Sequence, residues 1–329
     1  MAGARHPRPL IDSPAVQGRL GDYLMIVRYH IVLVAMTACV TFGWIFTGRY
    51  LWVVALLCGA DWFVINLLNR ITDLAEDEKN AIPGTARVRG AQGALFALCL
   101  AVLVTTLAIT FVWFPGLLLY RVAVQAIGVA YNYRVVPAPA SLRWPRPGEP
   151  VAVGIRMSRF KEMYFFKNFG SAVLFVLTCF AYPLAAVPEA RAASFVTVAT
   201  LMLFFVPYEL TFEILYDLRD VEGDTAEGVP TYPVVHGSRT STQIIDALLG
   251  ASVVVLVVGF FTRHLGVREL LMLAAPLAQL LFYRRRVKRG LTTPDCIWLT
   301  HLGSAELVLF LVGTSIWTRA GLPENVMLP

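Results

Sequence analysis

Apolar residues in this chain form long continuous runs that are separated by polar segments. A bilayer-spanning helix needs about 20 mostly apolar residues. Nine stretches approach or exceed that length, at 29–47, 51–68, 92–114, 116–131, 168–187, 194–216, 244–262, 269–283 and 297–317. Because these runs do not alternate apolar with polar positions, they predict helices and not the strands of a membrane barrel. We therefore expect an all-α integral membrane protein with a bundle of about nine transmembrane helices. A polar N-terminal segment, 1–28, precedes a single multi-helix domain, 29–329.

The composition agrees with this class. Hydrophobic residues make up 57% of the chain and charged residues 15%, and the mean hydropathy is +0.64. An average soluble domain has roughly 25% charged residues. The five cysteines form no CxxC pair and four of them fall inside apolar runs, so neither a zinc site nor a disulfide framework is indicated.

The positive charges predict the orientation. If the N-terminus is cytoplasmic, five of the 28 Lys and Arg residues lie in the segments on the opposite side, and almost all the others lie in cytoplasmic segments. This asymmetry is typical of multi-pass proteins that follow the positive-inside rule. The net charge of +6 therefore reflects topology and a lipid-facing surface, not nucleic-acid binding. We expect a location in a bacterial inner membrane or a plasma membrane.

Two acidic stripes lie at the predicted cytoplasmic ends of two helices. After the second apolar run, Asn69, Asp73 and Asp77 recur every four residues, which places them on one helical face. The sixth run ends in a similar stripe formed by Glu209, Glu213, Asp217, Asp220 and Asp224. Asp61, Glu209 and Glu213 lie deeper, where an ionised carboxylate costs roughly 2.5–3.5 kcal/mol on insertion scales. Intramembrane carboxylates therefore favour a functional role over a merely solvated helix end.

The stripes predict a metal and phosphate site. Hard oxygen ligands without His or Cys select Mg²⁺, which commonly binds through a few carboxylates and substrate phosphates. The segment before the fifth run contains Arg159, Lys161 and Lys167. Lys161 and Lys167 are suited to neutralising phosphate oxygens.

These stretches together resemble the UbiA superfamily of intramembrane prenyltransferases. The first motif of that superfamily is NDxxDxxxD, and the chain reads NRITDLAED at 69–77. The second is DxxDxxxD, which DLRDVEGD at 217–224 matches fully. The segments TAEGVPTYPVVHG (225–237) and FKEMYFFKN (160–168) also resemble elements of the family.

The resemblance implies a binding site for an isoprenyl diphosphate. Two Mg²⁺ ions that bridge the diphosphate would be held by Asn69, Asp73, Asp77, Asp217, Asp220 and Asp224, the aspartates being the catalytic residues. Lys161 and Lys167 would complete the diphosphate pocket. Candidates for stabilising the allylic cation are Tyr131, Tyr208 and Tyr216. Glu209, Glu213 or Asp61 would orient the acceptor or take the proton that is lost.

The first motif departs from the family at one position, because Arg70 replaces its second Asp. Either Arg70 contacts the diphosphate directly, or the first metal binds weakly. The main expectation is Mg²⁺-dependent transfer of a prenyl group to an aromatic or other lipophilic acceptor. One alternative is a UbiA-type terpene cyclase, in which the cation reacts with its own double bonds. Another is a cation-coupled transporter, which the surface position of the carboxylates disfavours.

Overall fold

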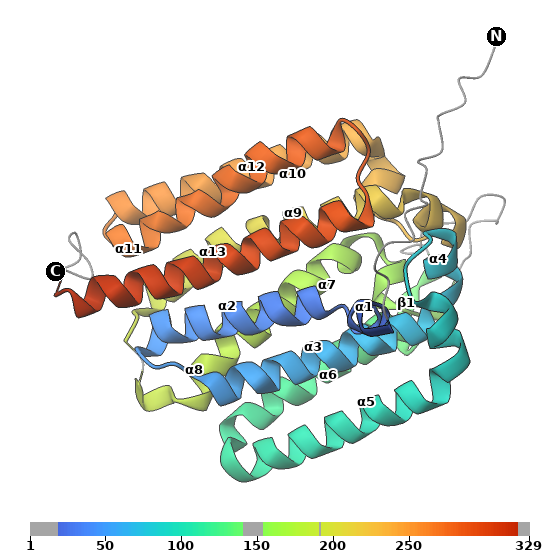
Figure 1. Ribbon diagram of the computed structural model, residues 1–329, viewed down its shortest axis with the longest axis horizontal. Helices are drawn as coiled ribbons and strands as arrows, with labels where there is room; N and C mark the ends of the chain where they lie inside the picture. Colours follow the sequence, from blue (N-terminus) through green and yellow to red (C-terminus); the bar gives the residue numbers. More distant parts are fainter. Residues whose placement is uncertain (1–18, 141–153, 191, 322–329) are drawn as a thin grey trace.

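The computed structural model describes residues 19–140, 154–190 and 192–321, and within these ranges the long helices lie side by side with roughly aligned axes (Figure 1). The first part contains α1 (Arg19–Ile26), α2 (Tyr29–Thr47), α3 (Trp52–Thr72), α4 (Leu74–Lys79), α5 (Thr85–Trp113), the turn η1 (Pro115–Leu117) and α6 (Leu118–Asn132). Strands β1 (Val136–Pro139) and β2 (Ile155–Ser158) follow, and then the turn η3 (Phe160–Glu162). The fifth expected span comprises α7 (Tyr164–Val176), the π-turn η4 (Leu177–Ala181) and α8 (Tyr182–Ala186). The remaining elements are η5 (Pro188–Ala190), α9 (Phe195–Glu227), α10 (Tyr232–Phe261), α11 (Val267–Leu270), η6 (Leu271–Leu273), α12 (Ala274–Val287) and α13 (Thr293–Arg319).

The prediction of a helical membrane protein is confirmed. Seven segments of the described chain are long and apolar enough to cross a membrane, and they contain α2, α3, α5, α7 with α8, α9, α10 and α13. Helices α6 and α12 coincide with the two other expected spans but have only 15 and 14 residues. The number of crossings and the side on which the N-terminus lies therefore stay predictions.

Local sequence explains where the long helices end. Helix α2 stops at Gly48, whose φ of 69° is a left-handed conformation that glycine adopts without steric cost. Ser194 caps the start of α9, because its hydroxyl accepts a hydrogen bond from the backbone N–H of Thr197 at 3.0 Å. Helix α13 begins with a capping box in which Thr292 and Asp295 satisfy each other's backbone N–H groups. The chain thus specifies the boundaries of its spans as well as their apolar interiors.

The basic segment between the fourth and fifth expected spans contains two short strands that the sequence did not predict. Strands β1 and β2 pair antiparallel, with Val136 opposite Ser158 and Pro139 opposite Ile155. This pairing returns the chain to the end of α6 and places η3, with Lys161, beside α4. The two paired strands therefore position Lys161, which is one of the two lysines expected to bind phosphate.

The two acidic motifs meet at one end of the bundle. Asn80, at the end of α4, accepts a hydrogen bond from the backbone N–H of Gly223 in α9 at 3.0 Å. A Cβ added at Gly223 would lie 2.4 Å from the Asn80 side chain, so glycine permits this close approach. Nearby, Lys79 and Glu227 form an ion pair with a separation of 2.6 Å. The helix ends that contain the motifs are thus tied together directly.

Asp61 lies in a buried polar network between helices and does not line either cavity described below. Its carboxylate accepts two hydrogen bonds from Arg121, at 2.6 and 2.8 Å, and one each from Gln125 and Tyr182, at 2.8 and 2.9 Å. These partners come from α6 and α8. Asp61 therefore holds three helices together, and the expectation that it faces an acceptor does not fit its position.

Candidate functional site

A polar cavity of about 140 Å³ lies where α3, α4, η3, α7 and α9 meet. Most of its charged and amide side chains come from the two acidic motifs, the helical turns before them and the basic segment, and Arg28 precedes α2. They are Arg28, Asn66, Asn69, Asp73, Glu76, Lys161, Lys167, Glu213, Asp217, Arg219 and Asp220. Residues that are 144 positions apart in the sequence, such as Asp73 and Asp217, thus face one space. The resemblance implied that residues of both motifs form one site, and this arrangement is compatible with it.

The first half of this cavity is built around the break between α3 and α4. Helix α3 ends at Asp73, where the backbone leaves the helical conformation and α4 begins. The Asp73 carboxylate accepts hydrogen bonds from the Asn69 amide and from Arg159, and it pairs with Lys161 at 2.6 Å. Asn69 also donates to the side-chain oxygen of Asn132 at 3.2 Å. At this break Asp73 therefore contacts both α3, through Asn69, and the basic segment, through Arg159 and Lys161.

Lys161 bridges two carboxylates of the first motif. Its ammonium group lies 2.6 Å from Asp73 and 2.9 Å from Glu76. Burial by itself would lower the pKa of Lys161, but the nearby Asp73 and Glu76 raise it above its ordinary value. Burial would likewise raise the pKa of Glu76, yet Lys161 and Lys167 hold it below its ordinary value. Both groups are therefore charged at neutral pH.

The second half belongs to α7 and α9. Lys167 donates to Asp217 at 2.5 Å and to Asp224 at 3.3 Å, and Asn168 donates to the other oxygen of Asp217 at 2.8 Å. The Oδ1 atom of Asp224 is buried and has no hydrogen-bond partner. The Asp220 carboxylate accepts two hydrogen bonds from Arg219, one from Nε and one from Nη2. Each aspartate of the fully matched motif thus contacts a cation of the protein itself.

Arg70 and Asp77 lie apart from the cavity. They form a buried ion pair, and Arg70 also donates to the carbonyl oxygen of Pro83 at 2.7 Å. Neither residue lines the polar cavity. The direct contact between Arg70 and a diphosphate, which the sequence suggested as one possibility, is not compatible with this orientation, because the guanidinium points to the loop after α4.

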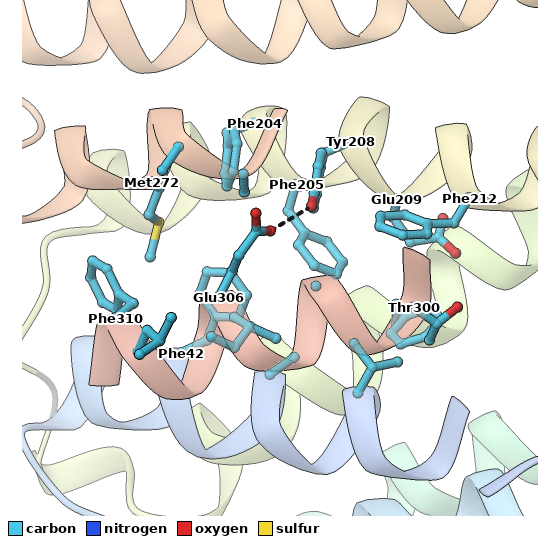
Figure 2. Close-up of a pocket in the computed structure, with 18 of the residues that line it drawn as sticks. Phe42, Phe204, Phe205, Tyr208, Glu209, Phe212, Met272, Thr300, Glu306 and Phe310 are labelled. Atoms are coloured by element: carbon cyan, nitrogen blue, oxygen red, sulfur yellow. Dashed lines mark hydrogen bonds between the residues drawn. The ribbon is translucent and has the colours of Figure 1, made fainter. Parts of the chain in front are cut away.

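A second, apolar cavity has a volume of about 410 Å³ and shares lining residues with the first. Figure 2 shows some of the residues that line it. It lies between α2, α9 and α13, with η6 and the start of α12 at one side. Glu213 and Tyr216 line both cavities. The Ser171 hydroxyl lies 2.8 Å from Glu213 and 3.3 Å from Glu209, within hydrogen-bond distance of both carboxyl groups, and donates its one proton to one of them at a time. The two cavities thus meet at a carboxylate and a phenol on one face of α9.

The expected aromatic residues divide between the cavities. Tyr131 lines the polar cavity, Tyr208 lines the apolar one, and Tyr216 lines both. The phenol of Tyr216 hydrogen-bonds to Thr300 of α13 at 3.0 Å. Its ring therefore has a fixed orientation at the junction.

Sequence reasoning missed several residues of these cavities. Glu76 lies inside the first motif and Arg219 inside the second, and both line the polar cavity. They were missed because only residues at the regular helical spacing of the motif aspartates were considered. Asn168 directly follows the predicted Lys167. Glu306 was also detectable, because it is an acidic residue in the middle of the last apolar run.

In the described part of the chain, no three His, Cys, Asp or Glu side chains are arranged as ligands of one metal ion. The carboxylates of the polar cavity contact lysine and arginine instead. Their chemistry is nevertheless that of a hard-cation site, because the oxygen donors of both motifs face one cavity without His or Cys. The unpartnered Oδ1 of Asp224 adds a buried acceptor that a cation would satisfy.

The sequence of this chain matches one protein-family model. The model of the UbiA prenyltransferase family matches residues 159–303, a range that contains the second motif and both lysines but not the first motif. No curated protein sequence matches the chain.

Several solved structures have the same architecture. A UbiA homologue from Archaeoglobus fulgidus, bound to DMAPP and Mg²⁺, matches with a TM-score of 0.64 and 16% identity, over 89% of this chain and 98% of its own. A homologue from Aeropyrum pernix K1 matches with a TM-score of 0.58 and 17% identity, over 88% and 98% of the two chains. A digeranylgeranylglyceryl phosphate synthase matches with a TM-score of 0.55 and 15% identity, over 90% and 98%. At these identities the likeness shows the fold. The chain is thus similar to the UbiA prenyltransferase family over residues 159–303 and shares the fold of the solved UbiA homologues.

Proposed function

We propose that this protein is a Mg²⁺-dependent intramembrane prenyltransferase. It ionises an isoprenyl diphosphate and transfers the prenyl group to an aromatic or other lipophilic acceptor. The observation that carries the proposal is the pair of adjoining cavities, one lined by lysines and carboxylates and the other by apolar side chains, which meet at Glu213 and Tyr216. An amphiphile with a diphosphate head and a hydrocarbon tail has matching polar and apolar parts. The A. fulgidus homologue bound to DMAPP and Mg²⁺ supports this substrate class.

The metal ligands of the proposal come from both motifs. Asn69 and Asp73 of the first motif and Asp217, Asp220 and Asp224 of the second have oxygen donors suited to Mg²⁺. Bound Mg²⁺ would neutralise negative charge that develops on the departing diphosphate. Asp77, which the resemblance also implies as a ligand, contacts Arg70 instead of the cavity. Of the aspartates implied as ligands, only Asp73 of the first motif lines the polar cavity, whereas Asp217 and Asp220 of the second motif both line it.

Lys161 and Lys167 would bind the diphosphate oxygens. Both ammonium groups are largely buried and already line the polar cavity. Rotating their side chains from the carboxylates to a substrate phosphate exchanges one charge-assisted hydrogen bond for another. Because the lysines are held in place before the reaction, they stabilise the leaving group without a large reorganisation.

Beyond the leaving group, the junction would receive the allylic cation. The rings of Tyr131 and Tyr216 present electron-rich faces, which attract a cation. Glu213 and Glu209, held by Ser171, are placed to orient an acceptor or to take the proton that is lost. The apolar lining beyond them limits the water that competes for the cation.

The first test separates substrate binding from the choice of acceptor. Purified protein in detergent is mixed with farnesyl S-thiolodiphosphate, which resists ionisation, and its melting temperature is measured with and without Mg²⁺. We expect stabilisation only when both are present, and its loss in Asp217→Ala. Glu189→Gln, which changes an exposed carboxylate in η5, serves as the matched control. Equal stabilisation of wild type and Asp217→Ala, or none at all, would contradict the proposal.

The second test measures transfer. Geranyl, farnesyl and geranylgeranyl diphosphates are incubated with the protein, Mg²⁺ and a panel of phenolic lipids, and released pyrophosphate and extracted products are quantified. The proposal requires a Mg²⁺-dependent prenylated product for at least one pair. Ligand binding without release of pyrophosphate under any condition would instead favour a transporter.

A further inference from the structure

One hydrogen bond crosses the apolar cavity from one wall to the other. Glu306 projects from α13 toward α9, and its carboxyl group accepts a hydrogen bond from the phenol of Tyr208 at 3.3 Å (Figure 2). Both side chains line the cavity. We call this bonded pair the polar bridge. It places polar atoms in the middle of a space whose lining is mostly apolar.

The polar bridge divides the cavity along its length. On the side of the junction with the polar cavity, the phenol of Tyr216 bonds to Thr300, which precedes Glu306 in α13. Helices α9 and α13 therefore run antiparallel along the cavity. On the other side of the bridge the cavity is lined by Phe204, Met272 and Phe310 (Figure 2). A chain that enters from the junction thus reaches these three residues only after the bridge.

The junction and the polar bridge are separated by about two to three isoprene units. Tyr208 precedes Tyr216 by eight residues in α9, which is about 12 Å along a helix. An extended isoprene unit adds four bonds, or about 5 Å from ordinary bond lengths. With its allylic carbon at the junction, a geranyl chain ends before the bridge, and the third unit of a farnesyl chain lies against it. A fourth unit has room only beyond the bridge.

Crossing the polar bridge is unfavourable for a hydrocarbon chain. The chain must either displace the hydrogen bond or pack against the carboxyl group, and a buried polar group that loses its partner raises the free energy. In a wholly apolar cavity each further isoprene unit would instead tighten binding, because every buried CH₂ group contributes favourably. An apolar side chain at position 306 would also be less costly in a membrane-spanning helix than glutamate is.

We propose that the polar bridge limits the length of the prenyl donor, so that the protein favours isoprenyl diphosphates of at most three isoprene units. The inference rests on the proposed function, in which the diphosphate binds in the polar cavity and the hydrocarbon tail in the apolar one. It assigns Glu306 and Tyr208 a role in the choice of donor and none in the chemical step.

The experiment measures the affinities of the geranyl, farnesyl and geranylgeranyl S-thiolodiphosphates in the presence of Mg²⁺. It compares wild type with a double variant that combines Glu306→Leu and Tyr208→Phe. This variant removes both polar groups together, so neither is left buried without its partner. Glu189→Gln is the control, and melting temperatures without ligand check that each variant is folded.

The expected result is a change in selectivity between the two longer chains. In wild type the farnesyl analogue should bind more tightly than the geranyl analogue, and the geranylgeranyl analogue no more tightly than the farnesyl analogue. In the double variant, the affinity for the geranylgeranyl analogue relative to the farnesyl analogue should rise by at least about tenfold, because the fourth unit gains apolar contacts. Tyr208→Phe alone should give a smaller rise, and it replaces the double variant if that does not fold.

Glu306→Gln distinguishes the polar bridge from the charge of Glu306. The glutamine side chain keeps an oxygen that accepts the hydrogen bond from Tyr208, so its selectivity should stay within about threefold of wild type. Wild-type selectivity in the folded double variant, or the selectivity of the double variant in Glu306→Gln, would refute the proposal. Tighter binding of the geranylgeranyl than of the farnesyl analogue by wild type would refute it as well. Absence of Mg²⁺-dependent binding of every analogue would instead contradict the proposed function, and the inference with it.

Discussion

Lys167 donates a hydrogen bond to Asp217 at 2.5 Å, so a cation of α7 and a carboxylate of the second motif neutralise each other inside the polar cavity. Two consequences follow for a Lys167→Met variant. Prenyl transfer should fall by about 10²–10³-fold, the range observed when one preorganised charge-stabilising donor is removed. The Mg²⁺ concentration for half-maximal binding of the thiolodiphosphate should decrease, because the ammonium no longer competes for Asp217.

These two readouts separate the charge of Lys167 from its contribution to folding. Lys167→Arg, which keeps the charge, should recover part of the activity and restore the wild-type Mg²⁺ dependence. If Lys167→Met retained full activity, Lys167 would have no role in binding the diphosphate.

The buried pair of Arg70 and Asp77 predicts a stability effect. Removing one partner of a buried ion pair leaves an uncompensated charge and costs about 3–5 kcal/mol. Arg70→Met should therefore lower the melting temperature of the detergent-solubilised protein sharply. The double variant Arg70→Met with Asp77→Leu should recover most of the loss, since both charges are gone.

The same variants test the metal assignment of Asp77. If Asp77 serves only Arg70, the double variant keeps Mg²⁺-dependent binding of the thiolodiphosphate, whereas Asp73→Asn loses it. Loss of Mg²⁺-dependent binding in a well-folded double variant would restore Asp77 to the metal ligands.

The polar network around Asp61 is expected to be structural. Asp61→Ala would leave Arg121 buried without its carboxylate and should destabilise the protein by about 3–5 kcal/mol. In the fraction of Asp61→Ala protein that is folded, the KM for the diphosphate should differ from the wild-type value by less than a factor of about three. A large change in KM with an unaltered melting temperature would place Asp61 in the substrate site after all.

The predicted orientation can be tested with engineered cysteines. All five native cysteines are buried, so a membrane-impermeant maleimide should not label the wild type in intact cells. Glu78→Cys in α4 and Glu189→Cys in η5 introduce thiols at the opposite ends of the bundle. If the polar cavity faces the cytoplasm, only the cysteine at 189 is labelled before lysis. Labelling at 78 alone would invert the topology.

The length of the apolar runs predicted the helical spans, and helical spacing predicted the two acidic stripes. That the stripes form one site was implied by the resemblance to the UbiA superfamily. Lys161 and Lys167 were also found from charge alone, and both line the polar cavity. The pairing of Arg70 with Asp77 could not be predicted. Helical spacing places a side chain on a face, but the backbone leaves the helical conformation at Asp73, between these two residues.

The network of Asp61 shows a second limit. An isolated carboxylate in an apolar run looks functional until its partners are known, and Arg121 comes from a different helix. Which helices face each other depends on packing, which one sequence does not reveal. The same reason hid the meeting of Glu306 with Tyr208, since 98 positions separate them.

The lysine and arginine contacts of the motif carboxylates mean that the cavity contains its own counterions. A divalent cation arriving alone would displace the ammonium groups of Lys161 and Lys167 and leave them without anionic partners. A diphosphate arriving alone would draw the lysines away and leave the carboxylates facing one another. Only the joint arrival of both keeps every charge paired, so metal and substrate should bind with strong mutual cooperativity. Without its substrate the protein should therefore bind Mg²⁺ only weakly, and without Mg²⁺ it should bind the diphosphate only weakly.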